Sequence, residues 1–557
     1  MKGEKRMDNN MVKEGWQYER TAQDEPQINN LAEIEKLGKK AKRLRHLGIG
    51  SILYALIYTF CLYRNASGIT YPFFVGATLL YFGYYTREYT ESCSREHSLW
   101  VKASWYRRFL AAAALILGAL NCMTDSGALI FFNKVLLLLV LGVLALQTWH
   151  DVSGWSIAAH LKGLFHLAIG IISQIFTPFY DWGASKKLRR QRGEPDAKNN
   201  SEEKKRILVC VSIGLVIGLP LVCILLMLLG SADVVFYNLV CDLLSFQIDV
   251  DFADFLYHTV SAAFMAFVVF IGAYGVFCYC NDPADMKAVD EMAVRKEKGF
   301  DTYIAVTIST LVCVIYLVFS CVQILGLFMG RLKLPEGYTY AEYARSGFFQ
   351  LVFVCLINVV LVLCMLAYFE TGRALRAVLC VICGCTYIME VSGLFRLLMY
   401  IEMYHLTFTR VLALWGLAVI AIVMGGVTYC IFCPKFRLFQ YALVAVSICW
   451  MLFSAAHPDY WIAKYNIAMS ATCENVDTYY IKNRLSMDAA PALVEAEFNF
   501  IGEYGEMNGK YKEWRIKDYQ EETKGLLGFR HFNFSKAYAC SHDIDGLNQG
   551  EKAVKNP

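Results

Sequence analysis

Eleven apolar stretches, each about long enough to cross a lipid bilayer, lie between Leu47 and Ala456. The clearest runs from Ile207 to Leu229 and contains no charged residue in 23 positions. An α-helix rises about 1.5 Å per residue, so about 20 apolar residues match the ~30 Å hydrocarbon core of a membrane. Because such stretches recur along the chain, the sequence predicts an integral membrane protein with many spans.

The composition supports the same class. Hydrophobic residues make up 57% and charged residues 18% of the 557 positions, and the mean hydropathy is +0.39, which is too apolar for a soluble chain of this length. We expect an all-α fold: a polytopic helical membrane bundle of about 11 transmembrane helices, followed by a small, polar, α-helical C-terminal tail domain. The predicted spans are residues 47–63, 69–85, 106–122, 128–147, 207–229, 257–280, 302–329, 346–368, 375–400, 408–432 and 438–456.

Basic residues between the spans predict the orientation. If the N-terminus is cytoplasmic, the inner loops hold 23 Lys and Arg residues and the outer loops hold 5. Lys and Arg prefer the cytoplasmic side of a membrane. We therefore predict a cytoplasmic N-terminus and an extracytoplasmic C-terminus.

The order of polar and apolar segments predicts five parts. They are a polar cytoplasmic N-terminus (1–46), four transmembrane helices (47–147), a basic cytoplasmic loop (148–206), a seven-helix membrane core (207–456) and an extracytoplasmic domain (457–557). The first 30 residues are charged and poor in aliphatics, which predicts disorder. Within the basic loop, the apolar but His- and Lys-containing segment Trp155–Trp182 favours an amphipathic helix on the inner surface. The alternative is a further span, which would invert every later segment.

Polar residues inside the predicted spans form a candidate site. Glu390 and Asn358 lie near the middle of their spans, and Arg396 lies six residues nearer the outside. A charge at the bilayer centre costs about 3 kcal/mol, so each charge needs a reason. One interpretation is a binding or permeation site, with Glu390 accepting a cation or proton and Arg396 holding an anion. The other is an interhelical hydrogen-bond network that only fixes packing. The predicted layer comprises Asn358, Glu390, Arg396, Glu402, Gln323 and Gln350.

Cysteines offer two further candidates. Five cysteines near the cytoplasmic ends of predicted spans have spacings that suit zinc or an iron–sulfur cluster, although buried cysteine often packs as a small apolar side chain. They are Cys380, Cys383, Cys385, Cys430 and Cys433. In the tail, Cys473 and Cys540 would lie on the oxidising face, where a disulfide could join them. The alternative is two free thiols, and we expect no cofactor.

Several local patterns resemble one family of multi-pass membrane proteins. In the membrane region they are Gly68–Phe74, Gly230–Phe236 and Thr339–Gln350, followed by Arg396, Tyr400, Thr407 and Arg410, with His405 in place of an expected glycine. In the tail they are Asn466, Asp477, Tyr480, Ser486, Asp488, Arg530, Asn533 and Ser535. The chain thus resembles the bacterial domain-of-unknown-function family 4173, with its 4153 relatives. The resemblance implies a membrane bundle in a bacterial plasma membrane and supplies no activity.

No catalytic motif is recognisable, so we lean against an enzyme. We favour an envelope sensing or regulatory component, because an outer tail and a basic inner loop suit a protein that relays a signal to other membrane or signalling proteins. A transporter that uses the polar layer is the alternative. A membrane enzyme acting on lipid or envelope substrates through Asp233, Asp477 and Asp488 ranks third. The lipid bilayer is the expected partner, and nothing in the sequence indicates nucleic acid.

Overall fold

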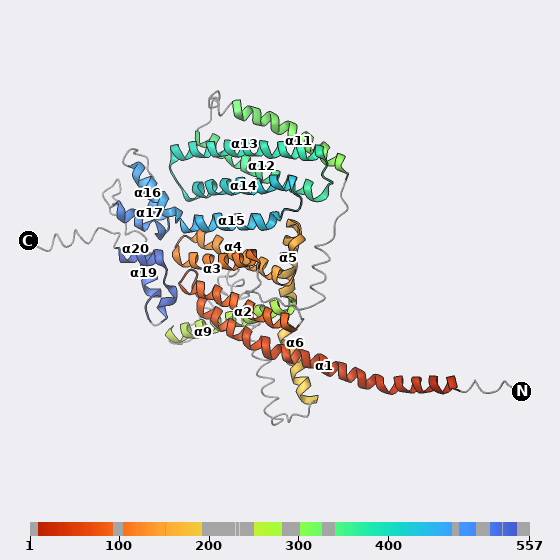
Figure 1. The fold of residues 1–557 in the computed structure, drawn as a ribbon. Coiled ribbons are helices and arrows are strands. Elements are labelled where there is room, and N and C mark those ends of the chain that lie inside the picture. Colours follow the sequence, from red (N-terminus) through yellow and green to blue (C-terminus); the bar gives the residue numbers. More distant parts are fainter. Residues whose placement is uncertain are drawn as a thin grey trace, which may run out of the picture. The chain divides into compact units, whose positions relative to one another are not determined.

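The computed structural model describes residues 9–92, 104–150, 152–191, 229, 233, 250–280, 301–325, 340–470, 478–496, 513–525 and 527–542 (Figure 1). Every regular element in these ranges is a helix, which confirms the predicted all-α class. The chain divides into two compact units. One comprises Met1–Tyr63 and Ile169–Asn281, and the other comprises Arg64–Ala168 and Asp282–Pro557.

The first unit is built on α1 (Asn9–Leu62), which packs against α6 (Thr177–Gln191) and α9 (Val250–Cys280). A fully buried carboxylate joins the three helices. Asp181 on α6 accepts hydrogen bonds from Arg43 Nε at 2.6 Å and Nη2 at 2.7 Å, and from the Tyr274 hydroxyl at 2.7 Å. A buried charge is stable only when it is paired, so this contact fixes how α1, α6 and α9 meet.

Helix α1 begins well before the first predicted span. It starts at Asn9 and continues into the apolar span Glu33–Leu62. The disorder expected for the first 30 residues stays a prediction.

Nine described helices are long and apolar enough to cross a membrane. The count becomes ten if α5 (Ile157–Ser173) and α6, which are bent by 46°, form one broken span. These nine match nine of the eleven predicted spans. The predicted span 69–85 lies in α2 (Thr70–Ser92), which is not among the nine. The predicted span 207–229 lies outside the described residues, apart from Leu229. Whether Trp155–Trp182 lies on the membrane or crosses it stays a prediction.

The second unit contains the remaining membrane helices, which run side by side (Figure 1). At its centre α13 packs against α11, α12 and α14, while α15 packs against α14, α3 and α4. Fully buried Leu375, Leu379, Ile382 and Met424 form part of the main core. The helix bounds are α3 (Trp105–Met123), α4 (Gly127–Trp149), α11 (Thr302–Gln323), α12 (Tyr340–Tyr368), α13 (Arg373–Tyr404), α14 (Phe408–Phe432) and α15 (Leu438–Ala455).

The tail after α15 is helical, as predicted, and lies at one end of these membrane helices (Figure 1). Its own apolar core includes Ile462, Ile481, Leu485 and Leu493, and it packs against Phe408 at the start of α14. The tail elements are α16 (Pro458–Ser470), α17 (Thr478–Asn483), the 3-10 turn Met487–Ala489, α18 (Ala490–Glu495), α19 (Glu513–Glu522), the 3-10 turn Gly528–His531 and α20 (Phe534–Ser541).

Candidate functional site

Two buried aspartates join the tail to the loop between α3 and α4. Asp488 accepts hydrogen bonds from the backbone N–H of Asp125 at 2.7 Å and from the Thr124 hydroxyl at 2.5 Å. In return, Asp125 accepts one from the backbone N–H of Met487 at 3.2 Å and pairs with Arg515 at 2.9 Å. Both carboxylates are almost completely buried. Each aspartate therefore accepts a hydrogen bond from the segment that carries the other. If the tail undocked, both segments would lose these buried hydrogen bonds.

Asn533 makes a second buried connection. Its side-chain amide donates to the carbonyl oxygens of Ser67 at 3.1 Å and Thr124 at 2.9 Å. Its side-chain oxygen accepts from the N–H of Lys536 and so caps α20. One fully buried side chain thus links the start of α20 to two loops at the end of the membrane helices.

Two further contacts hold the tail at the same end. Asn65 donates to the carbonyl of Arg530 at 2.7 Å, and the approach is so close that a Cβ on Gly68 would overlap that carbonyl. Asn466 exchanges two hydrogen bonds with the backbone of Leu406, at 2.9 Å and 3.0 Å. The tail therefore contacts the loop before α2, the loop between α3 and α4, and the loop between α13 and α14.

Backbone strain gathers in the loops on this side of the unit. Among the described residues, three that are not glycine have positive φ: Arg64 at 54°, His405 at 61° and His457 at 47°. Such conformations cost of order 1–3 kcal/mol and persist where the surroundings impose them. The value at His405 explains why glycine would suit the position, because glycine adopts positive φ without penalty.

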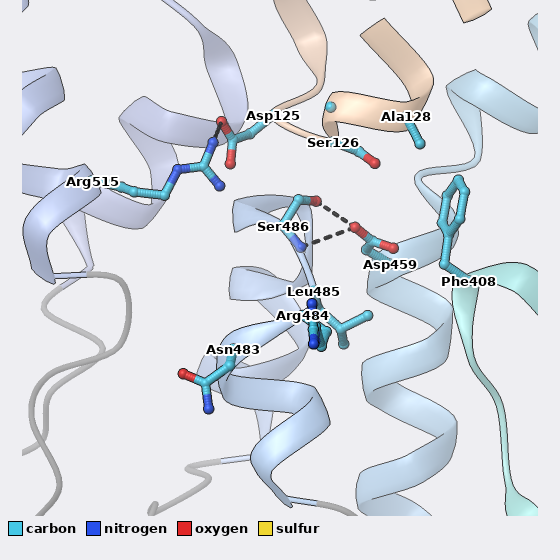
Figure 2. Close-up of a pocket in the computed structure, with 11 residues that line it drawn as sticks. Asp125, Ser126, Ala128, Phe408, Asp459, Asn483, Arg484, Leu485, Ser486 and Arg515 are labelled. Atoms are coloured by element: carbon cyan, nitrogen blue, oxygen red, sulfur yellow. Dashed lines mark hydrogen bonds and ion pairs between the residues drawn. The ribbon is translucent and has the colours of Figure 1, made fainter. Parts of the chain in front are cut away.

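A cavity of about 450 Å³ lies between the tail and the start of α4. Figure 2 shows Asp459 in its wall, with one carboxylate oxygen bonded to the N–H and hydroxyl of Ser486 at 3.0 Å and 2.5 Å. The second oxygen has no hydrogen-bond partner among the described residues, and Asp459 is only 3% exposed. The lining residues are Asp125, Ser126, Gly127, Ala128, Phe408, Asp459, Asn483, Arg484, Leu485, Ser486 and Arg515.

Asp125, Asp459 and His457 form a cluster of side chains whose pKa values differ from their ordinary values. Burial raises the pKa of Asp459 to about 6, although the Ser486 hydrogen bonds oppose the change. Burial also raises the pKa of Asp125, against the charges of Arg515 and Lys536. The hydrogen bond to Asp488, at 3.2 Å, raises the pKa of His457. All three groups therefore bind a proton more tightly when the tail is docked than when it is exposed to water.

Acidification should consequently strengthen docking. A group with a raised pKa favours the docked state below that pKa, and the advantage is lost as the pH rises through it. When the pH falls from 7.5 to 5.5, we expect Asp459 alone to stabilise the docked tail by about 1 kcal/mol. The charged groups that face the cluster from neighbouring elements are Asp488, Arg515 and Lys536. Hydrogen exchange of the α18 and α20 amides against pH measures the effect. Asp459→Asn should lose most of it, and weaker docking at pH 5.5 would contradict the assignment.

The structure separates the predicted polar layer into parts. The Tyr316 hydroxyl donates to Asn358 at 2.6 Å, and Asn358 donates to Thr386 at 2.9 Å. Nearer the tail, Gln323 accepts from Ser392 at 2.6 Å and from Arg396 at 3.2 Å. Glu390 is buried, and neither of its oxygens has a hydrogen-bond partner among the described residues. Gln350 and Glu402 are exposed and join neither network.

The other predicted sites are not assembled in the described residues. No group of three or more His, Cys, Asp or Glu side chains in those ranges is arranged to hold a metal ion. Cys383, for example, packs as an apolar side chain in the main core, and Cys380 and Cys430 pack against the same core. Cys540 lies on α20, but Cys473 and Asp477 are outside the described residues, so the disulfide stays a prediction. Asp233 is exposed and belongs to the other unit.

The resemblance marked Asn466, Ser486, Asp488 and Asn533, and the structure places all four where the tail meets the membrane helices. Other residues at this junction were missed: Thr124, Asp125, His457, Asp459 and Arg515. One signal was available. Asp125 lies in the very short loop between two spans, where a lone acidic residue has few local partners.

The comparison with family models gives one match. Residues 99–496 match the domain of unknown function DUF4153, which covers most of the membrane region and the first part of the tail. Neither the comparison with curated proteins nor that with solved structures found a match. The family number 4173 and a bacterial source stay predictions from the resemblance. The match spans well over half of the chain, and the protein therefore belongs to the DUF4153 family.

Proposed function

We propose that this integral membrane protein is a non-enzymatic sensing or regulatory component of the cell envelope. The observation that carries the proposal is the attachment of the tail by buried side chains, above all Asp488 and Asn533, to loops that join separate membrane helices. A signal that displaces the tail must break these bonds. It thereby changes the ends of several helices at once, which is how a local event biases a larger two-state element.

The same proposal gives the protein an orientation. Its tail faces the outside of a bacterial plasma membrane, its N-terminus lies in the cytoplasm, and the basic end of α6, with Arg189 and Arg190, is available to signalling partners. Single cysteines at Arg190 and Asn508 test this arrangement with a membrane-impermeant reagent. We expect labelling at position 508 in intact cells, and labelling at position 190 only after the cells are broken.

A specific observation favours transport as a second candidate. Glu390 is buried in α13 with no hydrogen-bond partner for its carboxylate among the described residues. An intramembrane ionisable group of this kind marks an ion or proton pathway in many membrane proteins. In this alternative, Glu390 carries a cation or proton, and the Asn358 and Arg396 networks hold the neighbouring helices.

An enzyme is less well supported. Asp125 and Asp459 both line the cavity, as a carboxylate pair in a hydrolase would. However, Asp125 already accepts from Arg515 and Met487, and one oxygen of Asp459 is bonded to Ser486. Among the described carboxylates that line the cavity, a single oxygen, on Asp459, has no hydrogen-bond partner, which suits binding better than paired acid–base chemistry.

Two variants separate sensing from transport. Asn533→Ala removes both buried bonds to the helix loops and should weaken docking by about 2 kcal/mol. Glu390→Gln keeps the shape of the side chain but removes its charge. If the protein is a sensor, the transcript profile of cells with Asn533→Ala should approach that of a deletion strain, while Glu390→Gln stays near wild type. A transporter would give the reverse result.

The matched control is Ser541→Ala on the same helix as Asn533. Its hydroxyl is exposed and bonds only within the end of α20. It should behave as wild type, with all variants present in the membrane at equal amounts. Wild-type profiles for both Asn533→Ala and Glu390→Gln would contradict sensing and transport alike.

A further inference from the structure

The cavity at the docked tail has the size and the wall of a ligand site. Its volume of about 450 Å³ is within the range of small-molecule pockets. The wall combines the start of a membrane helix, two arginines, an aromatic ring and two buried carboxylates, as Figure 2 shows in part. Of the two, Asp125 is paired with Arg515. Both the tail and the membrane helices contribute to this wall, so an occupant would touch both.

One wall is suited to an anion. The helix α4 is 23 residues long and begins at Gly127, and the side chain of its N-cap residue Ser126 makes no capping hydrogen bond. The backbone N–H groups of Gly127 and Ala128 have no partner within the helix, because the first turn lacks acceptors. They carry the positive end of the helix dipole. Arg484 lines the same cavity, as does Arg515, whose charge is paired with Asp125.

A second wall is suited to a cation. Asp459 lines the cavity and is 3% exposed, and its second carboxylate oxygen has no hydrogen-bond partner among the described residues. A buried carboxylate oxygen without a partner costs about 1–3 kcal/mol. A protonated amine would supply both the missing hydrogen bond and the missing charge. This unpaired oxygen is an observation independent of the helix start, and its chemistry suits a cationic donor.

We propose that the cavity binds a small zwitterion, with its protonated amine on Asp459 and its carboxylate or phosphate on the N-terminus of α4. The proposal rests on the sensing function above and gives the signal a chemical class. An anion alone would leave Asp459 unpaired, and a cation alone would leave the helix N–H groups unpaired. Two sources carry this chemistry: a dissolved amino acid or amino phosphate, and the head group of an amine-bearing phospholipid.

Calorimetry on the full chain in phosphatidylcholine nanodiscs tests the class. The probes are phosphoethanolamine and glycine as zwitterions, ethanolamine as the cation alone and inorganic phosphate as the anion alone. We expect one of the zwitterions to bind at least tenfold more tightly than either half. Equal binding of phosphate alone, or no binding of either zwitterion, would overturn the proposal.

A change of lipid distinguishes the two sources. If the natural ligand is the lipid head group, nanodiscs containing phosphatidylethanolamine should weaken the binding of added phosphoethanolamine at least tenfold, because the lipid occupies the cavity. If the ligand is a dissolved zwitterion, the same lipid should change the affinity less than twofold. Both results support the proposal, and each identifies one source of the ligand.

Two variants locate the two halves of the ligand. Asp459→Asn keeps an oxygen for Ser486 but removes the charge. Gly127→Asp places a negative charge at the anion wall, where no atom lies within 4 Å of its Cβ position and where an acid stabilises the helix. Both should weaken zwitterion binding at least tenfold. The controls Gly127→Asn and Glu495→Gln, the latter in the exposed Lys464 pair, should stay within twofold.

The results also separate this proposal from the function on which it rests. If a zwitterion binds but hydrogen exchange in α18 and α20 does not change, the result would support the ligand site and contradict the sensing function. If neither zwitterion binds, but the transcript profile of Asn533→Ala cells resembles that of a deletion strain, the results would support the sensing function and contradict the ligand class.

Discussion

Replacing Asp488 with Ala is expected to release the C-terminal tail while the membrane helices stay folded. The change removes the acceptor of the Asp125 N–H and of the Thr124 hydroxyl, and it leaves His457 without its carboxylate. Breaking a buried polar network by removing one member costs about 3–5 kcal/mol. A typical domain is stable by only about 5–15 kcal/mol, so the undocked tail should become a substantial population.

Hydrogen exchange and limited proteolysis measure this release. Protection should fall in α18 and α20 and stay unchanged in α12, α13 and α14. Asp488→Asn keeps one acceptor oxygen and should have an intermediate effect. Glu495→Gln is the matched control, because Glu495 forms an exposed pair with Lys464 in the same tail, and water screens such a pair so that it adds little to stability. Full protection in Asp488→Ala would show that these buried bonds do not hold the tail.

The membrane spans could be predicted from the sequence because each one carries its own signal. About 20 apolar residues in a row satisfy the bilayer without reference to the rest of the chain. The boundaries of α14 (Phe408–Phe432) coincide with the predicted span 408–432.

The members of the polar layer were predicted without knowing which way each helix faces. Each residue turns an α-helix by about 100°, so Glu402, six residues after Arg396, lies about 240° around α13. Ser392, four residues before Arg396, lies on nearly the same face and shares its acceptor Gln323. Depth along a span is readable from sequence, whereas the rotation of the helix depends on its neighbours.

The docking site could be predicted only in part for a related reason. Asp125 and Asp488 are 363 residues apart in the chain and meet only after the membrane helices have assembled. No periodic pattern connects two such positions. The family resemblance marked Asp488 and Asn533, but it gave no partner for either residue. Their roles depend on contacts that local sequence does not encode.

The other large effect is expected in the first unit, at Asp181. This carboxylate is fully buried and accepts two hydrogen bonds from Arg43 and one from Tyr274, so it joins α1, α6 and α9. Asp181→Ala leaves a guanidinium and a buried hydroxyl without their acceptor. The side chain of Arg43 is 39% exposed, which lets water compensate in part, so we expect a loss of about 3 kcal/mol in the stability of this unit.

Unfolding in mixed detergent micelles, followed by hydrogen exchange in α1 and α6, measures this loss. Tyr274→Phe removes one hydrogen bond but keeps the ion pair, so it should cost about 1 kcal/mol. Lys187→Met is the matched control on the same two helices. It breaks the exposed pair of Lys187 with Glu33, whose charged atoms are 2.6 Å apart. Because water screens an exposed pair, this change should leave the stability nearly unchanged. Equal losses for Asp181→Ala and Lys187→Met would mean that burial adds nothing to the Asp181 contact. The loss of stability should be largest for Asp181→Ala, smaller for Tyr274→Phe and smallest for Lys187→Met. Removing a buried charge leaves more groups without a partner than removing a hydroxyl or a solvated amine does.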